Sequence, residues 1–443
     1  MAQKIYLRWP VAIIPGAISL QAIRQLGFSV VDQVLAVGGM FLVNISLART
    51  QTKEAYGIFA LSYSAFTLLA GLHNAAIVET YTIYGSGRYR GHFRSYSRLL
   101  WRSNLLLVIA ATAALTLAWR LLAWAVPSLG STTGLGMALA CGMPLTALFL
   151  RRTFYMRRRP DLAARLSFVF FGICAALLWI SFRAGVLSGF SAFLIVAAGW
   201  GLSATLMASE LPGRAAGEDF MELEPRYWAQ HWKYARWALV TAFVFQLTTQ
   251  AYYWLAAGLV SVKDVANLRA LLNVVVPMDQ VFTATNLLML PMLCARYESA
   301  SVAGVVSLWK VYCASWFAMT CVFAGIVNIL GRPVMHFLYS GAFDDVSSLV
   351  GMLALLPLVM GIGHTINAAL KAAERPDVVF TAYVFSGAVT FIAGVPLVTH
   401  LGLRGAVYGL ITSGAAYTLA LALGLWRITS VGANWSAPLS SAS

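Results

Sequence analysis

Charged residues are scarce in this sequence, and acidic residues are the scarcest. Only 11% of the 443 residues are charged, with 16 acidic against 31 basic, and 60% are hydrophobic. The mean hydropathy is +0.75. Soluble globular domains carry about 25% charged residues, so this composition excludes an ordinary soluble protein. We expect an all-α polytopic membrane protein.

Motifs of enzymes and metalloproteins are also missing. The Gly85-Ser-Gly turn lacks the Lys-Ser/Thr that a phosphate-binding loop requires. The cysteines have no metal-ligand spacing and are expected to pack as small apolar residues. We therefore expect no metal site, no cofactor and no catalytic residue. The five cysteines all fall in apolar stretches: Cys141, Cys174, Cys294, Cys313 and Cys321.

Long apolar stretches are abundant. A transmembrane helix needs about 20 predominantly apolar residues, and twelve stretches meet that length, although eleven or thirteen spans remain alternatives because the second and eighth are long. The twelve predicted spans lie near residues 26–48, 56–84, 104–126, 133–150, 166–185, 190–209, 238–260, 268–294, 309–330, 347–368, 378–399 and 405–426.

Basic residues are concentrated in every second gap between the spans. With twelve spans both termini lie on one side, and that side holds 23 of the 31 lysines and arginines while the other holds 8. Basic loops face the cytoplasm, so both termini are expected there. The net charge of +15 then reflects topology and attraction to anionic lipid headgroups. We expect membrane lipids, and no nucleic acid, as its partners.

The longest polar interruption divides the predicted spans into six plus six. Residues 210–237 open with a polar linker and end in an aromatic and basic run, which is typical of a helix at the headgroup level; a docking site for a partner enzyme is the alternative. Lys53-Glu54 and Lys263-Asp264 occupy corresponding turns, a weak sign of an internal repeat. The predicted parts are a cytoplasmic interfacial segment (1–25, with no signal-peptide cleavage site), an N-terminal lobe (26–209), the linker (210–237), a C-terminal lobe (238–426) and a cytoplasmic tail (427–443).

Polar residues recur inside several spans, where they are costly unless they face a cavity or a partner. Gln246, Thr249, Gln250 and Tyr253 follow helical spacing along the seventh span. Helix–helix hydrogen bonding also uses such residues, but stripes on several helices favour a central polar cavity between the two lobes. The predicted path residues are Gln33, Asn44, His73, Gln246, Thr249, Gln250, Tyr253, Arg269, Asn273, Gln280, His364 and Asn367.

Three carboxylates lie at or near membrane depth. Asp32, Glu79 and Asp279 are candidates to load a coupling ion, H⁺ or Na⁺, and Asp279 lies deepest, between two prolines. His73 and His364 are either proton carriers or interhelical hydrogen-bonding groups. The prolines within spans, Pro277, Pro291 and Pro357, are expected to kink their helices. In the longest outward loop, 331–346, the Asp344-Asp345 pair is interpreted as solvated, with divalent-ion binding as the alternative.

Three segments resemble bacterial polysaccharide and O-antigen flippases, members of the multidrug/oligosaccharidyl-lipid/polysaccharide (MOP) exporter superfamily. Residues 268–296, with Pro277, Asp279 and Gln280, resemble their eighth helix. Tyr56-Gly57 followed by Glu79 resembles the second helix, and Gly402-Leu-Arg-Gly405-Ala resembles the approach to the last. The twelve-span, two-lobe layout matches over essentially the whole chain.

The resemblance implies transport of an undecaprenyl-pyrophosphate-linked oligosaccharide from the cytoplasmic to the periplasmic leaflet of a bacterial inner membrane. It also implies a surface-polysaccharide pathway, in which the polymerase and glycosyltransferases are potential partners. Such flippases are expected to carry cations within the cavity, whereas here the cations lie toward its two ends. The candidate pyrophosphate contacts are Arg49, Arg88, Arg269, Arg296 and Lys371.

Two other functions remain open. A cation-coupled multidrug and toxin extrusion antiporter could use the same fold, and Asp32 and Asp279 would supply acidic groups for cationic drugs. The many amide and hydroxyl groups suit sugars better. A membrane-embedded polymerase or ligase is disfavoured, because the short exterior loops leave little room for a catalytic site.

Overall fold

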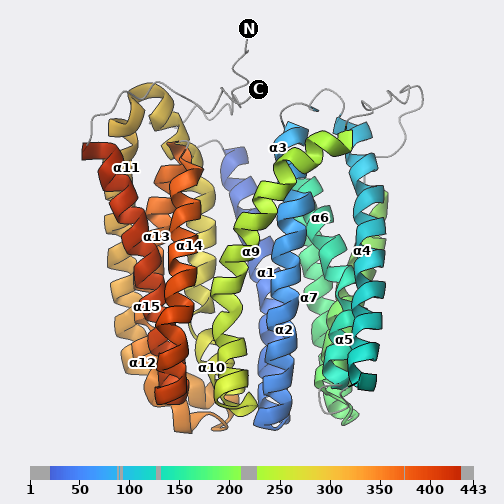
Figure 1. The fold of residues 1–443 in the computed structure, drawn as a ribbon. Helices are drawn as coiled ribbons and strands as arrows, with labels where there is room; N and C mark the ends of the chain where they lie inside the picture. Colours follow the sequence, from blue (N-terminus) through green and yellow to red (C-terminus); the bar gives the residue numbers. More distant parts are fainter. Residues whose placement is uncertain are drawn as a thin grey trace. The chain divides into compact units, whose positions relative to one another are not determined.

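The computed structural model describes residues 20–86, 89, 93–125, 131–210, 227–373 and 375–430, and in these ranges every regular element is a helix (Figure 1). The predicted segment 1–25, the linker 210–237 and the tail 427–443 lie wholly or largely outside the described residues. Nine of the described helices are long and apolar enough to cross a membrane. The all-α polytopic fold predicted from the sequence is therefore confirmed.

These nine helices match predicted spans 1–6, 9, 10 and 12. The other three predicted spans are also helical, but two of them are less apolar than the nine and one is shorter. Spans 7 and 8 carry the polar residues of the predicted path, which lower their hydropathy. Span 11 is broken at Ala393, so that Pro376–Ile392 (α14) is a shorter apolar helix.

The chain divides into two compact units. Unit 1 contains residues up to Ala270 together with Leu338–Ala342, and unit 2 contains the rest. The linker 210–237 was predicted to separate the two lobes. The boundary between the units lies later, at Ala270, because Tyr227–Leu259 (α9) packs against Lys53–His73 (α2) within unit 1. The six-plus-six division of the spans stays a prediction.

Unit 1 is built on six spans and α9. Helix α1 packs along α7, α7 along α8, and α8 along α5, so these four form the body of the unit. Side-chain caps start several of them: Thr52 Oγ1 accepts from Ala55 N (3.2 Å) at α2, and Ser188 and Ser191 form a capping box at α8. Besides α2 and α9, the α-helices with residues in unit 1 are α1 (Leu20–Thr50), α3 (Thr80–Ser86), α4 (Phe93–Ala125), α5 (Thr132–Ala140), α6 (Gly142–Met156), α7 (Pro160–Arg183), α8 (Gly189–Leu206) and α10 (Val262–Asn273).

A π-helical stretch, Asn74–Glu79 (η1), interrupts the second span, and the start of α9 crosses the end of the unit beside it (Figure 1). His231 Nε2 lies 2.7 Å from the carbonyl oxygen of Ala76, and the Tyr234 hydroxyl donates to Glu79 Oε1 at 2.8 Å. The beginning of α9 is thus helical and tied across α2–η1–α3, and its place at the headgroup level stays a prediction.

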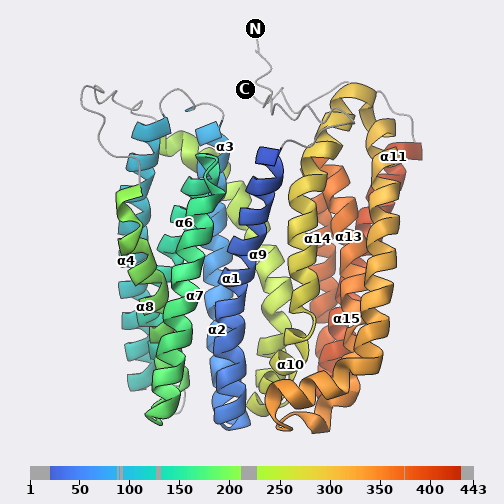
Figure 2. The same cartoon turned by 180° about the vertical axis from the view of Figure 1, so that it is seen from behind.

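Pro277 follows a break between two helices and does not kink a continuous one. Helix α10 ends at Asn273, and α11 (Val276–Tyr339) starts one residue before Pro277, which therefore occupies a first-turn position where its missing N–H costs nothing. Helix α11 has two arms joined by an arch (Figure 2), and these arms are predicted spans 8 and 9. The second arm runs to Tyr339, so the predicted outward loop 331–346 is shorter than expected.

The rest of unit 2 is formed by η5 (Asp344–Leu349), α12 (Val350–Leu353), α13 (Leu355–Ala372), α14 and α15 (Gly394–Ser430). Helix α15 is two helices joined at Gly402, whose positive φ of 57° suits glycine. Asp344, the first residue of η5, has its Oδ2 2.7 Å from Nδ1 of His336 in the last turn of α11. No metal-binding group of three or more ligands occurs in the ranges the structure describes.

The two units share a local motif. Arg159-Pro160-Asp161 starts α7 and Arg375-Pro376-Asp377 starts α14, the fifth and eleventh predicted spans. In both, the arginine Nε donates to aspartate Oδ1 at 2.9 Å and Nη2 lies 2.8 Å from Oδ2. The same helix start, six spans apart, is what duplication of a six-span half would produce.

Candidate functional site

An arginine framed by tyrosines lies at one end of unit 1. Arg269 Nε donates to Asn44 Oδ1 at 3.0 Å, and Arg269 Nη1 donates to the Tyr253 hydroxyl at 3.4 Å. Its guanidinium carbon lies 4.6 Å from the centroid of the Tyr63 ring, a cation–π contact. The Tyr56 hydroxyl also donates to Asn44 Oδ1, at 3.4 Å. The sequence predicted Asn44, Tyr253 and Arg269, and the structure brings the three together.

The ends of four helices place this cluster. Asn44 is near the end of α1, Tyr56 near the start of α2, Tyr253 near the end of α9 and Arg269 in α10. Gly57 allows the close approach, because a Cβ there would lie 2.1 Å from the carbonyl oxygen of Val262. The turns at Lys53-Glu54 and Lys263-Asp264, which predicted an internal repeat, also meet here. Lys263 Nζ lies 2.9 Å from Glu54 Oε1.

The cluster has no counter-charge among the residues that the structure describes. Among the described residues, no carboxylate forms an ion pair or hydrogen bond with Arg269, which instead contacts an amide, a hydroxyl and an aromatic face. A guanidinium has five N–H donors, so donors remain for another acceptor. Because an unpaired cation away from water is costly, the arrangement suits an anion that accepts several hydrogen bonds.

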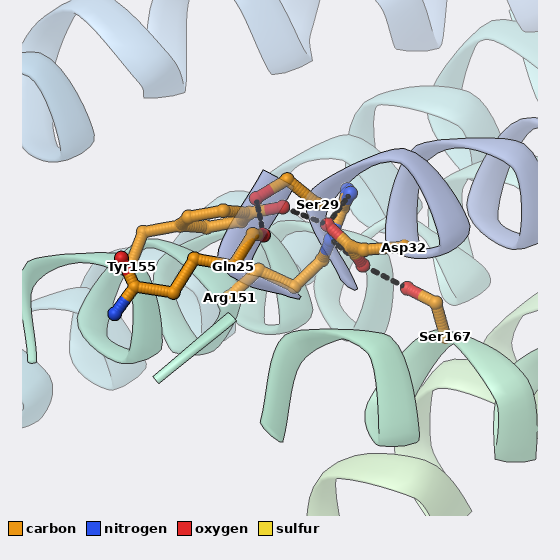
Figure 3. Close-up of polar contacts among 6 residues, drawn as sticks. All are labelled: Gln25, Ser29, Asp32, Arg151, Tyr155 and Ser167. Carbon is orange, nitrogen blue, oxygen red and sulfur yellow. Dashed lines mark hydrogen bonds and ion pairs between the residues drawn. The ribbon is translucent and has the colours of Figure 1, made fainter. Parts of the chain in front are cut away.

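A second polar cluster is closed on itself. Asp32, fully buried on α1, receives hydrogen bonds from Arg151 Nε (3.2 Å) and Nη2 (2.7 Å), Tyr155 Oη (2.7 Å) and Ser167 Oγ (2.5 Å), as Figure 3 shows. The arginine and tyrosine come from successive turns of α6, and the serine from α7. All three partners converge on one carboxylate, so this cluster joins three helices of unit 1.

This geometry bears on the predicted role of Asp32. Its two oxygens accept four hydrogen bonds, two of them from a bidentate guanidinium. A cation bound at Asp32 would have to displace the guanidinium of Arg151 from the carboxylate oxygens. The contacts therefore favour a role in holding the helices together over a role in binding a cation.

The other predicted residues of unit 1 contact neighbouring helices. His73 is buried, and its Nε2 lies 2.6 Å from Oδ1 of Asn104 on α4; no partner for His73 Nδ1 occurs among the described residues. Gln246 packs on Gly71, where a Cβ would lie 2.2 Å from its Nε2. The remaining residues are half-buried: Gln33, Thr249 and Gln250.

In unit 2 the predicted residues fall into two groups. Asn367 is buried, and its Nδ2 donates to the hydroxyls of Tyr417 (2.7 Å) and Tyr383 (3.2 Å). The centroid of the His364 ring lies 4.5 Å from the centroid of the Phe282 ring. Asp279 is exposed, and in the described part of the chain its carboxylate has no hydrogen-bonding or ionic partner. Among the remaining predictions, Asn273 is buried, Gln280 half-buried, and Arg296 and Lys371 exposed.

Arg49 and Arg88 are the other two predicted pyrophosphate contacts. Arg49 Nε donates to the carbonyl oxygen of Leu338 at 2.6 Å, so it holds a turn of the chain within unit 1. Arg88 lies outside the described residues. Arg269 is thus a candidate that the structure places in a cluster of predicted residues.

The comparison with known proteins rests on structure. No protein-family model and no curated protein matches this sequence. A multidrug resistance MATE family transporter of the MOP superfamily, in an inward-facing conformation, matches with a TM-score of 0.69 and 12% identity over 95% of this chain and 98% of its own. This chain has the MATE transporter fold.

Further structures share the MATE fold with this chain. An outward-facing multidrug resistance MATE family transporter matches with a TM-score of 0.66 and 13% identity, over 92% of this chain and 96% of its own. A MOP superfamily transporter from Pyrococcus furiosus matches with a TM-score of 0.67 and 11% identity, over 93% and 97%. The reversed polarity of the latter's binding pocket is described as suggesting a different function. One fold thus accommodates pockets of different polarity.

Proposed function

We propose that this protein is a transporter that moves an undecaprenyl-pyrophosphate-linked oligosaccharide from the cytoplasmic to the periplasmic leaflet by alternating access. It would act in the bacterial inner membrane, with both termini in the cytoplasm, for surface polysaccharide synthesis. H⁺ or Na⁺ would couple the movement. Its partners would be membrane lipids and, in the same pathway, the polymerase and glycosyltransferases.

The cluster around Arg269 carries this proposal. Its guanidinium is held by Asn44, Tyr253 and Tyr63 with no described carboxylate beside it. A pyrophosphate supplies the missing charge and accepts hydrogen bonds in the bidentate geometry that arginine prefers. A cationic drug would be repelled at this position. The tyrosine hydroxyls and the amide of Asn44 suit the sugar attached to the pyrophosphate.

The direct test is to delete the gene and follow radiolabelled undecaprenyl-pyrophosphate oligosaccharide across the inner membrane. The proposal predicts accumulation in the cytoplasmic leaflet with loss of surface polysaccharide, both reversed by the intact gene. Normal surface polysaccharide in the deletion strain would contradict it.

Replacing Arg269 by glutamine is expected to reduce export at least tenfold, because a hydrogen bond to a charged group is worth about 1.5–3 kcal/mol. Arg269→Lys keeps the charge but loses the planar fork, so an intermediate rate is expected. Arg332→Gln is the matched control, since Arg332 is exposed near the end of α11. Export is measured in the complemented deletion strain at equal protein levels. Equal losses in the Arg269 and Arg332 variants would overturn the role assigned to Arg269.

A cation-coupled multidrug antiporter is the second candidate. The solved structures that share the fold include multidrug resistance MATE transporters. The exposed carboxylate of Asp279, which has no partner among the described residues, would suit a cation. This function predicts that deletion leaves surface polysaccharide normal and increases sensitivity to cationic dyes, and that Asp279→Asn reproduces the sensitivity. Unchanged dye sensitivity would exclude it.

A further inference from the structure

Arg269 also holds together two turns of the chain. Its partners come from three helices, with Asn44 on α1, Tyr63 on α2 and Tyr253 on α9. One turn joins α1 to α2 and another joins α9 to α10, and both lie at the same end of unit 1 (Figure 1). One guanidinium on α10 therefore links the α9–α10 turn to the α1–α2 turn.

Two other described contacts between these turns are weaker. The side chains of Lys263 and Glu54 are 60% and 51% exposed, and an ion pair in water stabilises a protein little. The close approach of Gly57 to Val262 lets the turns pack but supplies no charged contact. Hydrogen bonds from a guanidinium are about twice as strong as neutral ones, so Arg269 is the stronger tie.

The donors that Arg269 uses in these contacts are ones that a pyrophosphate needs. A guanidinium binds a phosphate through two adjacent nitrogens, either Nε with Nη2 or Nη1 with Nη2. Asn44 Oδ1 accepts from Nε at 3.0 Å, and the Tyr253 hydroxyl accepts from Nη1 at 3.4 Å. Each pair therefore includes one nitrogen that already binds a neighbouring helix. Bidentate binding of an anion competes with Asn44 in one geometry and with Tyr253 in the other.

The partner on α1 can give up Arg269 at little cost. Asn44 is only 1% exposed, and a buried oxygen left without any donor would be destabilising. Asn44 Oδ1 also accepts from the Tyr56 hydroxyl at 3.4 Å. When the anion takes Arg269, this oxygen therefore still has a donor.

We propose that the pyrophosphate opens this end of unit 1 by taking Arg269 from Asn44 and Tyr253. Without the anion, Arg269 is a latch that holds the α9–α10 turn against the α1–α2 turn, and with the anion the two turns separate. The turns belong to the second and the first six predicted spans, and carriers built from repeats change access by moving one repeat against the other. This inference rests on the proposed function, because the anion is that of the transported lipid.

The first measurement is the affinity of the full-length protein in detergent for farnesyl pyrophosphate, with farnesol as the probe that lacks phosphate. Replacing Asn44 by alanine should make farnesyl pyrophosphate bind about tenfold more tightly, because the anion no longer displaces a hydrogen bond to a charged group. Tyr253→Phe should also tighten binding, but by less, since its contact is longer. The probe carries no sugar, so a contact of Asn44 with the glycan does not enter the measurement.

Two controls accompany these variants. Arg269→Gln should bind farnesyl pyrophosphate at least tenfold more weakly, because it lacks the guanidinium that binds the anion. Asn104→Ala also removes a buried asparagine of unit 1, which contacts His73 across α4 and α2, and it should bind the probe as the native protein does.

The second measurement is amide hydrogen exchange of the same proteins, which reports local opening. Farnesyl pyrophosphate should increase exchange in residues 44–57 and 253–270 of the native protein, and should not do so in Arg269→Gln. In Asn44→Ala, exchange in these residues should be high before the probe is added. The start of α7 at Arg159 is the internal reference and should not change.

Each result decides the inference. Tighter binding by Asn44→Ala, together with increased exchange at both turns when the probe binds, supports the latch. Equal or weaker binding by Asn44→Ala overturns it, as does binding to the native protein without a change in exchange, and in both cases the proposed function stands. Absence of saturable binding to the native protein, or equal binding of farnesol, contradicts the proposed function as well. Should Asn44→Ala not fold, Tyr253→Phe decides by the same criteria.

Discussion

Replacing Asp32 by asparagine is expected to lower the free energy of unfolding by about 3–5 kcal/mol, because removing one partner of a buried ion pair leaves the other charge uncompensated. Asparagine keeps the size of aspartate, so packing is preserved. Arg151, only 13% exposed, would then keep its charge beside a neutral amide. Thermal unfolding in detergent should show a midpoint several degrees below that of the native protein.

Two further variants separate the ion pair from general effects of substitution. Asp32→Asn combined with Arg151→Gln removes both charges and should recover most of the lost stability, since the uncompensated cation is gone. Asp161→Asn breaks the more exposed pair with Arg159 and should cost less than about 1 kcal/mol. Losses that simply add in the double variant, or a stable Asp32→Asn protein, would show that the pair does not hold the helices together.

Replacing Gly405 by alanine is expected to cost about 3 kcal/mol, the upper range for overpacking a tight contact. A Cβ at this position would lie 1.9 Å from the carbonyl oxygen of Leu397 and 2.9 Å from the nitrogen of Val398. Both are backbone atoms just before the bend at Gly402, so no side-chain rotation relieves the clash. Thermal unfolding in detergent should show the destabilisation as a lower midpoint.

The control for Gly405 is another glycine in a helix. Gly172 lies in α7, and a Cβ there would have no heavy atom within 4 Å. Gly172→Ala should leave stability unchanged or raise it by about 0.5–1 kcal/mol, because alanine has the better helix propensity. Equal midpoints for the two variants would show that the close approach at Gly405 does not limit stability.

Hydropathy was sufficient to predict most of the fold. Each span is a local property of about 20 residues, and the helices found agree with the predicted ranges. Helix ends were less accurate where polar residues continue a helix, as in α11, which runs on to Tyr339. The Arg-Pro-Asp starts at Arg159 and Arg375 were a stronger sign of an internal repeat than Lys53-Glu54 and Lys263-Asp264, and they are visible in the sequence.

The site was predictable only in part. Polar residues within spans identified Asn44, Tyr253 and Arg269, because their cost inside a membrane sets them apart. Tyr63 could not be singled out, since tyrosines are common in this chain and only the fold places its ring over Arg269. Nor could the sequence show that Asp32 is paired, because 119 residues separate it from Arg151.

The π-helical stretch η1 also bears on how the second span evolved. A π-helical turn holds more residues than an α-helical one, and each added residue rotates the rest of the helix by roughly 100°. Beyond η1, Tyr81 faces Ser97 and Thr153, and Tyr84 reaches the carbonyl of Gln230. An ancestor lacking one residue here would have presented a different face to α4 and α9. Alignments with distant relatives should therefore place a one-residue gap within 74–79, where it leaves the flanking helices intact.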